Sequence, residues 1–332
     1  MYYASLKHAI YAPRPLPAAA DSYKANTYIE IIKQINNGNM KIRNTICECV
    51  SQLESDDFET KEKALETLVS ITKASPSNRN LLVLHNNNII IPTILTLLTN
   101  TPTLEKLSLS ILFNLSLNHN LKLTLAHTPT AIQHLNTIIL SYSLDSTRLA
   151  ASLICSLAML DKNKALFGVA NTIQALLKAL VSQHPAPHVT HHLLTSLAEL
   201  AHFHGNCTLA VRGGAVDVLL RIVENKVDDL SGTALVILGL LARFEEGLKA
   251  LVTTTPNIVA RMLHVLKLAA GSSRCNEGAT EILVRVFDES EECLKEAMGL
   301  PDLLFVLAEV SVTGSIPARE KASLLLKKLD RG

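Results

Sequence analysis

Apolar residues recur along this chain at nearly regular intervals. One apolar residue from each unit gives the series Leu68, Leu115, Leu157, Leu197, Leu240, Val286 and Leu329, with spacings of 47, 42, 40, 43, 46 and 43. A second series lies 20 to 25 residues before members of the first: Leu95, Leu135, Leu176, Leu219, Met262 and Leu304. A period of this size indicates stacked structural repeats, in which each unit buries its apolar face against its neighbours.

Each unit is expected to contain three helices. The fourth unit predicts helices over Asn206–Arg212, Ala215–Glu224 and Gly232–Arg243, and its middle helix has apolar residues at helical spacing. A polar series, Asn78, Asn120, Asn163 and Asn206, marks the first helix. The long, nearly all-apolar third helices are expected over Ala64–Thr72, Ser108–Ser116, Ala150–Leu160, His192–Ala201, Thr233–Ala242, Ala279–Phe287 and Ala322–Leu329. No segment alternates with period two, so strands are not expected.

Three helices on this period predict an all-α, right-handed armadillo-repeat superhelix, an α-solenoid. Residues 58–332 are expected to hold a partial first repeat followed by about six repeats. Residues 1–57 are expected to form a leader and capping helices, with helix candidates at Tyr28–Ile35 and Ile42–Leu53. The first 20 residues lack Asp and Glu, so an organelle presequence is an alternative to a disordered leader.

Composition narrows the class of partner. The chain has 332 residues, 48% of them hydrophobic and 4% aromatic, with no Trp. Lys and Arg total 31 and Asp and Glu total 30, so no overall charge favours nucleic acid. The densest apolar run, Ala234–Ala242, is far shorter than the roughly 20 residues of a membrane span. We therefore expect a protein partner, no nucleic acid, no membrane span, a monomer, and a location in the cytoplasm, the nucleus or both.

The chemical motifs predict no catalytic residue, no cofactor and no metal site. Histidines cluster at positions 184, 188, 191, 192, 202 and 204, but no Glu follows His188 as a metalloprotease helix requires. Gly213 and Gly214 lack the Lys-Ser/Thr of a phosphate loop and are read as the turn between two helices. No Gly-x-Ser-x-Gly elbow is present, so the chain is not expected to be an enzyme.

Charge is distributed unevenly. Residues 58–187 carry ten basic and six acidic residues, and residues 188–332 carry fifteen basic and eighteen acidic residues. Residues 277–309 carry nine acidic and two basic residues, a net charge of −7. Two interpretations stay open: a solvated outer face, or an acidic end of the binding surface that selects a basic segment. Glu289, Glu291 and Glu292 are expected at the start of a short helix.

Several local motifs resemble the armadillo region of plant U-box ubiquitin ligases. They are Asn114-Leu115-Ser116-Leu117, Ser156-Leu157-Ala158, Asp161-Lys162-Asn163-Lys164, Arg212-Gly213-Gly214-Ala215-Val216 and Glu320-Lys321-Ala322-Ser323-Leu324-Leu325. The resemblance covers about residues 58 to 332. It implies a domain that holds substrates or receptor-like kinases. The Trp-containing U-box module has no counterpart in residues 1–57, so the expected role is recognition without ligase activity.

The resemblance also implies a concave groove lined by the long helices. Importin-type armadillo proteins carry Trp and Asn there, but the equivalent positions here keep one Asn and no Trp. We predict a protein-binding groove formed by Ser110, Asn114, Arg148, Ser152, Ser156, His192 and Ser196. The main hypothesis is a non-enzymatic scaffold for a kinase or a ubiquitin-pathway substrate. A component or fragment of a U-box ligase, and a nuclear or cytoskeletal adaptor, are the alternatives.

Overall fold

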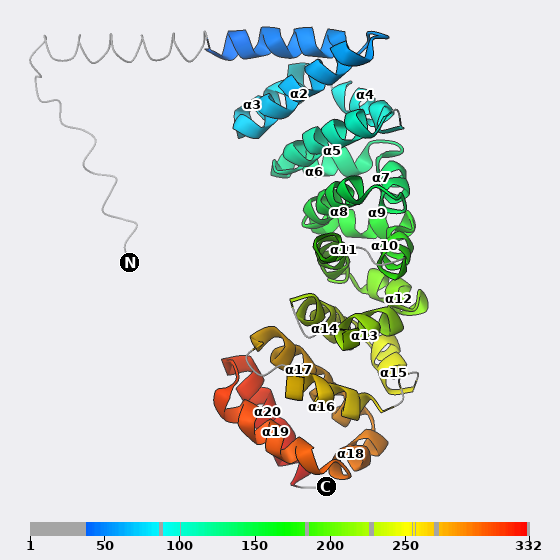
Figure 1. The fold of residues 1–332 in the computed structure, drawn as a ribbon, viewed down its shortest axis with the longest axis vertical. Helices are drawn as coiled ribbons and strands as arrows, with labels where there is room; N and C mark the ends of the chain where they lie inside the picture. The colour runs from blue at the N-terminus through cyan, green and yellow to red at the C-terminus, as the bar shows by residue number, and fades with distance from the viewer. Residues whose placement is uncertain are drawn as a thin grey trace, which may run out of the picture.

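The computed structural model describes residues 38–85, 89–99, 101–182, 186–225, 229–253, 255, 257–268 and 272–330. Throughout these residues the regular secondary structure is helical, and they contain no strand. The expectation of an all-α solenoid is confirmed (Figure 1). The predicted helix candidate at Tyr28–Ile35 and the possible presequence lie outside the described residues.

A helix over residues 38–52 and α2 (Phe58–Ala74) precede the first complete set of three helices. The sets that follow are α3 (Pro76–His85), α4 (Ile90–Thr96) with the 3-10 turn η1 (Leu97–Thr99), and α5 (Pro102–Ser116); α6 (His119–His127), α7 (Ala131–Ile139) and α8 (Leu144–Ala158); α9 (Asp161–Val169), α10 (Thr172–Val181) and α11 (Pro187–Leu200); α12 (His204–Arg212), α13 (Ala215–Asn225) and α14 (Asp229–Leu241); α15 (Glu245–Thr253), α16 (Ile258–Leu268) and α17 (Ser273–Glu289); and α18 (Glu291–Met298), α19 (Pro301–Thr313) and α20 (Ile316–Leu329).

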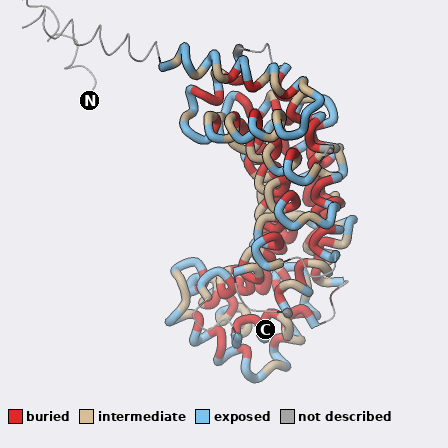
Figure 2. The backbone as a smooth tube through the Cα atoms, turned by 45° about the horizontal axis from the view of Figure 1, so that its top comes forward, coloured by how far each residue is buried: buried red, intermediate tan, exposed pale blue. Residues whose placement is uncertain are grey.

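The long third helices form one ladder. Each of α2, α5, α8, α11, α14, α17 and α20 contacts the next in this order. The second helices α7, α10 and α13 form a parallel row, and the short first helices join the two rows. The repeats therefore follow a curved path that is open on one side (Figure 2).

The core follows the apolar series closely. Leu68, Leu115, Leu157, Leu197, Leu240 and Val286 are buried, and Leu329 in the last helix is half-buried. In the second series the expectation for Leu304 is wrong, since this side chain is 53% exposed. The buried positions of α19 are Leu303, Val306, Leu307 and Val310, which match the spacing of Val259, Met262, Leu263 and Leu266 in α16. Val306 is therefore the equivalent residue, and Leu304 and Phe305 face outward.

Buried asparagines cap the ends of the long helices. Asn163 Nδ2 donates to the carbonyls of Leu157 and Lys122 at 3.0 and 3.1 Å. Asn206 Nδ2 does the same to Leu200 and Lys164, at 3.0 Å each. The last carbonyls of a helix have no partner within it, so this amide supplies one and joins two repeats.

The prediction that Asn120 belongs to this series is wrong. Asn120 is exposed, and the equivalent third position of α6 is Leu121. Asn78 at the same place in α3 donates to the carbonyl of Ile71 at 3.1 Å. The polar spacing alone placed the series one residue too early in α6, because the equivalent position holds the apolar Leu121 and carries no polar signal.

Buried cations follow these positions. Arg79, Lys122 and Lys164 occupy the fourth position of α3, α6 and α9, and each is at most 8% exposed. Arg79 donates to the carbonyl of Thr72 at 3.0 Å, and Lys122 donates to that of Ser156. A cation near the last carbonyls of a helix is favoured by the helix dipole.

The backbone geometry requires glycine at two positions. Gly214, between α12 and α13, has a φ of 80°, a conformation that side-chain-bearing residues rarely adopt. This confirms the interpretation of the glycine pair as a turn. A Cβ on Gly278 of α17 would lie 2.6 Å from the Cβ of Leu235 on α14, so glycine permits these two helices to approach closely.

The first described helix covers the start of the ladder. Ile46, Cys49 and Leu53 are buried in the same core as Leu65 and Leu68 of α2. The helix expected over Ile42–Leu53 is thus present, at residues 38–52. It gives α2 an apolar neighbour, as the exposed end of a repeat array requires. The boundary predicted after residue 57 falls in the turn between these two helices.

Candidate protein-binding surface

Helices α5, α8 and α11 carry the residues predicted to line the groove. Ser110 and Asn114 lie on α5, Arg148, Ser152 and Ser156 on α8, and His192 and Ser196 on α11. The three helices contact each other in this order. Equivalent positions therefore come into line across the repeats, as stacking predicts.

The structure divides this stripe by exposure. Ser110, Asn114, Arg148, Ser152 and His192 are half-buried and reach solvent. We name these five residues the concave stripe. They are the members of the predicted set that a partner can contact directly.

The expectation that Ser156 and Ser196 face solvent is wrong. Ser196 is 0% exposed, and its Oγ donates to the carbonyl of Ala151 at 2.6 Å on the neighbouring helix. Ser156 is 7% exposed and lies 2.8 Å from Ser116 Oγ. The helices approach closely at these small side chains, which therefore hold repeats together. Sequence could not distinguish a small residue at a wet surface from one at a tight helix contact.

Asn114 joins α5 to α2. Its Nδ2 donates to Thr72 Oγ1 at 3.1 Å and lies 3.5 Å from the carbonyl oxygen of Val69. The donor side of the amide is thus already used. The amide oxygen is the group that remains for a partner backbone N–H.

Ser152 and His192 contact each other across two repeats. Ser152 Oγ donates to the carbonyl of Arg148 at 2.8 Å and lies 3.1 Å from His192 Nδ1. The hydroxyl has one proton, so His192 Nδ1 donates to the oxygen in this arrangement. Neutral His192 then carries no proton on Nε2, and protonation turns Nε2 into a hydrogen-bond donor.

The concave stripe and its surroundings carry basic side chains. Arg148 forms no ion pair within the part of the chain that the structure describes. The nearby carboxylate, Asp145, is held by Lys106 at 2.7 Å, and this hydrogen bond and charge lower the pKa of Asp145. His188 and His191 lie on the same helix as His192. The surface therefore holds an unpaired guanidinium beside a row of imidazoles.

Burial lowers the pKa of His192 below its usual value of 6.5. The neighbouring His191, Arg148 and His188 lower it further, because each adds positive charge beside the ring. The rings of His191 and His192 meet edge to face, with centroids 5.6 Å apart. Protonation of His192 is thus opposed by a cationic surrounding that an anion would neutralise.

The concave positions nearer the C-terminus are occupied by internal ion pairs. Glu281 of α17 pairs with Arg285 at 2.6 Å and with Lys321 of α20 at 2.9 Å, and Lys328 pairs with Asp288. Glu281 and Arg285 are equivalent to Ser110 and Asn114 in the repeat series. Their charges satisfy each other, whereas Arg148 on α8 forms no ion pair among the described residues.

Sequence analysis missed two sets of polar residues. The buried cations at Lys122 and Lys164 were not singled out, although both follow the start of a first helix at the same offset. Asn276 on α17, which is 8% exposed, was also missed. A check of equivalent positions in every first helix would have found the lysines. No sequence signal distinguishes Asn276.

Within the described residues, no group of three or more His, Cys, Asp or Glu side chains is placed to hold a metal ion. No single described helix is long and apolar enough to cross a bilayer. Helices α9 and α10 reach the length and hydropathy of a membrane span only when they are taken together, and they are bent by 72° relative to each other. Glu291 and Glu292 occupy the first turn of α18 as expected, whereas Glu289 ends α17.

The fold and its family are established by comparison. The family model for the plant U-box protein ARM repeat region matches residues 41–331. This chain therefore belongs to the armadillo repeat proteins, and within them to the plant U-box protein ARM repeat region family. No curated protein matches the sequence at a significant level.

Solved structures with the same fold are distant in sequence. An engineered protein is 18% identical, with a TM-score of 0.72 over 88% of this chain and 68% of its own. A designed armadillo repeat protein is 14% identical, with a TM-score of 0.53 over 85% of this chain and 98% of its own. Another designed armadillo repeat protein, in complex with the peptide (KR)4, is 13% identical, with a TM-score of 0.56 and the same coverages. These likenesses show the fold.

Proposed function

We propose that this protein is a non-enzymatic scaffold that binds an acidic or phosphorylated segment of a partner protein on the concave stripe. The observation that carries the proposal is the unpaired guanidinium of Arg148 beside His188, His191 and His192. Asp145 interacts electrostatically with Arg148 and His188, but its ion pair is with Lys106, and a guanidinium without an ion pair of its own favours an anionic ligand. Membership of the armadillo repeat family supports a scaffold role.

The residues of the stripe have complementary tasks in this proposal. The planar guanidinium of Arg148 suits a carboxylate or phosphate in bidentate geometry. His192 becomes a second donor when it is protonated. The amide oxygen of Asn114 accepts a backbone N–H of an extended segment, which fixes its register.

The designed relative that binds (KR)4 provides a contrast. Its peptide is basic throughout, whereas the exposed centre of the stripe in this chain is itself basic. Charge complementarity therefore supports the opposite partner here. The shared fold supports binding of an extended segment, and the side chains decide its charge.

Family membership also supports a cellular context. We propose that the partner is a receptor-like kinase or a ubiquitin-pathway substrate, since the family takes its name from plant U-box proteins. Phosphorylated segments of kinases would supply the anionic groups. A component of a U-box ligase and a nuclear or cytoskeletal adaptor are the competing roles, and localisation to the cytoplasm or nucleus is part of the same proposal.

Peptide binding tests the surface. Fluorescence anisotropy would compare a labelled Glu-rich peptide, its phosphoserine counterpart and a neutral Gln counterpart. We expect both anionic peptides to bind, and Arg148→Glu to weaken them by about tenfold or more. Lys178→Glu, which makes the same charge change at an exposed position of α10, is the matched control. Equal losses for the two variants, or equal binding of the neutral peptide, would contradict the proposal.

Partner capture tests the context. Proximity labelling in plant cells would compare the wild-type chain with Arg148→Glu. Partners lost only from the variant are those held by the stripe. Recovery of kinases or ubiquitin-pathway proteins in this group supports the proposed role, and recovery of nuclear or cytoskeletal proteins alone argues for the adaptor.

A further inference from the structure

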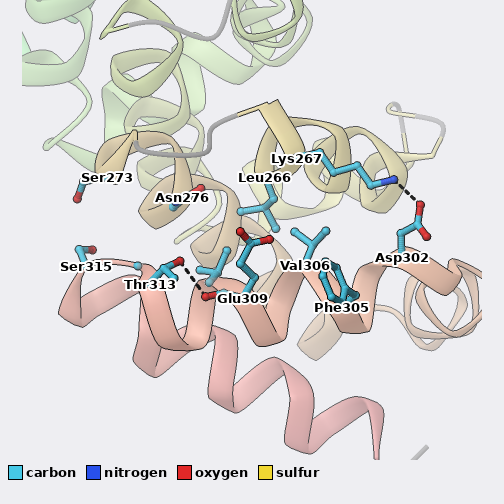
Figure 3. Close-up of a pocket in the computed structure, with 12 residues that line it drawn as sticks. Leu266, Lys267, Ser273, Asn276, Asp302, Phe305, Val306, Glu309, Thr313 and Ser315 are labelled. Atoms are coloured by element: carbon cyan, nitrogen blue, oxygen red, sulfur yellow. Dashed lines mark hydrogen bonds and ion pairs between the residues drawn. The ribbon is translucent and has the colours of Figure 1, made fainter.

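A cavity opens between the second helices of the last two repeats. It is lined by α16, α19 and the N-terminal ends of α17 and α20, and its volume is about 610 Å³ (Figure 3). The corresponding seams elsewhere, between α7 and the start of α5, between α10 and α13, and between α13 and α16, hold about 310, 370 and 350 Å³. The cavity at the last seam is thus larger than these three.

The walls of this cavity are apolar. Leu266 of α16 and Val306 and Val310 of α19 are each at most 7% exposed and line it. Phe305 lies at its rim and is 73% exposed. Phe305 lies near Asp302 in the view of Figure 3. A ligand entering here would contact aliphatic groups along its length and an aromatic ring at the rim.

Two polar groups without partners lie in the same cavity. Asn276 of α17 is 8% exposed, and its Oδ1 has no hydrogen-bond partner among the described residues. Glu309 of α19 forms no ion pair in the described part of the chain, and its carboxylate is directed toward Leu266 (Figure 3). An amide oxygen buried without a donor is costly, so a ligand that brings a donor is favoured.

The other charged groups of the cavity are already paired. Asp302 accepts from Lys267 at 2.5 Å at one end. At the other end, Ser273 and Ser315 of the lining donate to Glu277, which lies outside the lining, at 3.0 and 2.5 Å. The surrounding segment, residues 277–309, has nine acidic and two basic residues. The negative charge of this segment therefore disfavours an anionic ligand. The carboxylate of Glu309, which has no ion pair among the described residues, favours a cationic ligand.

We propose that this cavity binds an arginine side chain from a segment of a partner protein, with the guanidinium on Glu309 and Asn276. An arginine has an aliphatic stem that suits Leu266 and Val306, and a planar head with five donors for a carboxylate and an amide oxygen. The ring of Phe305 at the rim adds an apolar contact for the stem. A lysine offers one compact charge and satisfies this set less well. This site is separate from the concave stripe and opposite to it in charge preference.

Methyl NMR tests the site directly. Protein labelled at Leu and Val methyls would be titrated with the peptide Ac-Gly-Ala-Arg-Ala-Gly-NH2 and with its citrulline and lysine counterparts. We expect shifts of the Leu266 and Val306 methyls, and binding of the arginine peptide about tenfold tighter than that of the uncharged citrulline peptide. The lysine peptide should bind between these two.

Two exposed carboxylates provide matched variants. Glu309→Gln should weaken the arginine peptide by about fivefold or more, whereas Glu292→Gln on α18 makes the same charge change outside the cavity and should leave binding unchanged. Absent methyl shifts at millimolar peptide, equal binding of arginine and citrulline, or equal losses for both variants would overturn the proposal. Arg148→Glu on the concave stripe should not weaken this peptide, so failure of one site is distinguishable from failure of the other.

Discussion

Ser152 Oγ on α8 lies 3.1 Å from His192 Nδ1 on α11, and this contact joins consecutive repeats at the solvent-facing edge of the ladder. Four residues further along the same two helices, Ser156 and Ser196 are buried. One turn of helix thus separates a surface that a partner can reach from a contact that holds the solenoid together.

The pH dependence of anion binding follows from His192. Because its pKa lies below 6.5, His192 is neutral near pH 7 and gains its proton only at lower pH. We expect the affinity for a Glu-rich peptide to rise as the pH falls from about 7.5 to about 5.5. His192→Gln should reduce this rise, as measured by anisotropy titrations at several pH values. An unchanged pH profile in the variant would contradict the role of His192.

The stability of the free protein should change in the opposite direction. The folded state resists protonation of His192, while the unfolded state takes up the proton near pH 6.5. The free energy of unfolding contributed by this group is therefore present above pH 6.5 and is lost as the pH falls. Thermal unfolding without peptide, compared between wild type and His192→Gln, measures this difference.

Core packing predicts a contrast between neighbours on α11. Leu197 is 0% exposed, so Leu197→Ala should lower the free energy of unfolding by about 2–5 kcal/mol. Ser196→Ala removes the hydrogen bond to the carbonyl of Ala151 and should cost about 1 kcal/mol. Urea unfolding followed by circular dichroism measures both. A larger loss for Ser196→Ala than for Leu197→Ala would contradict this assignment of the core.

Lys122 is predicted to destabilise the fold through its charge. Burial lowers the pKa of Lys122, and no carboxylate among the described residues forms an ion pair with it, whereas Lys164 is held by Asp161 and Glu199 at 2.7 and 3.0 Å. The folded state therefore releases this proton before the unfolded state does, and stability gains from the group as the pH rises toward 10.5.

Lys122→Met tests this linkage. Because a buried charge is replaced by an apolar side chain of similar length, we expect stability at pH 7 to be unchanged or higher. The wild-type protein should approach the variant as the pH is raised, as followed by urea unfolding at each pH. A variant that is much less stable at every pH would show that the hydrogen bond to the Ser156 carbonyl outweighs the cost of burial.

The close contact of α14 and α17 depends on Gly278. Gly278→Ala would place a Cβ 2.6 Å from Leu235 Cβ, and this overpacking should cost about 1–3 kcal/mol. Gly239→Ala is the control, because its new Cβ would lie 3.6 Å from Glu281 Cγ, an ordinary contact, and alanine favours the helix. Thermal unfolding should separate the two. Loss of stability in Gly239→Ala alone would contradict the prediction.

Ubiquitin ligase activity is not expected from this chain by itself. The prediction rests on the absence of Trp from the sequence, because the U-box module of plant U-box ligases contains a Trp. An autoubiquitination assay with activating enzyme, a panel of conjugating enzymes and this chain should match the control without the chain. A signal above that control would show that this chain can recruit a conjugating enzyme.

The sequence by itself determined the repeat architecture. The spacing of residues such as Leu115, Leu157 and Leu197 predicts both the helices and their burial, because a solenoid repeats one local packing solution. The motifs around Gly213 and Asn163 were sufficient to identify the family. The predictions for Asn120 and Leu304 were wrong, because each depended on a single residue and not on the pattern of a whole helix.

Only the tertiary structure decided which polar residues face solvent. Ser152 and Ser156 are chemically identical and share one helix, but Ser152 is half-buried and reaches solvent, whereas Ser156 is 7% exposed and lies against Ser116 of α5. Glu277 and Glu309 differ in a similar way. Glu277 accepts hydrogen bonds from two serines, whereas Glu309 lines the cavity and has no ion pair among the described residues. These differences depend on contacts about 40 residues apart along the chain, which a local sequence pattern does not contain.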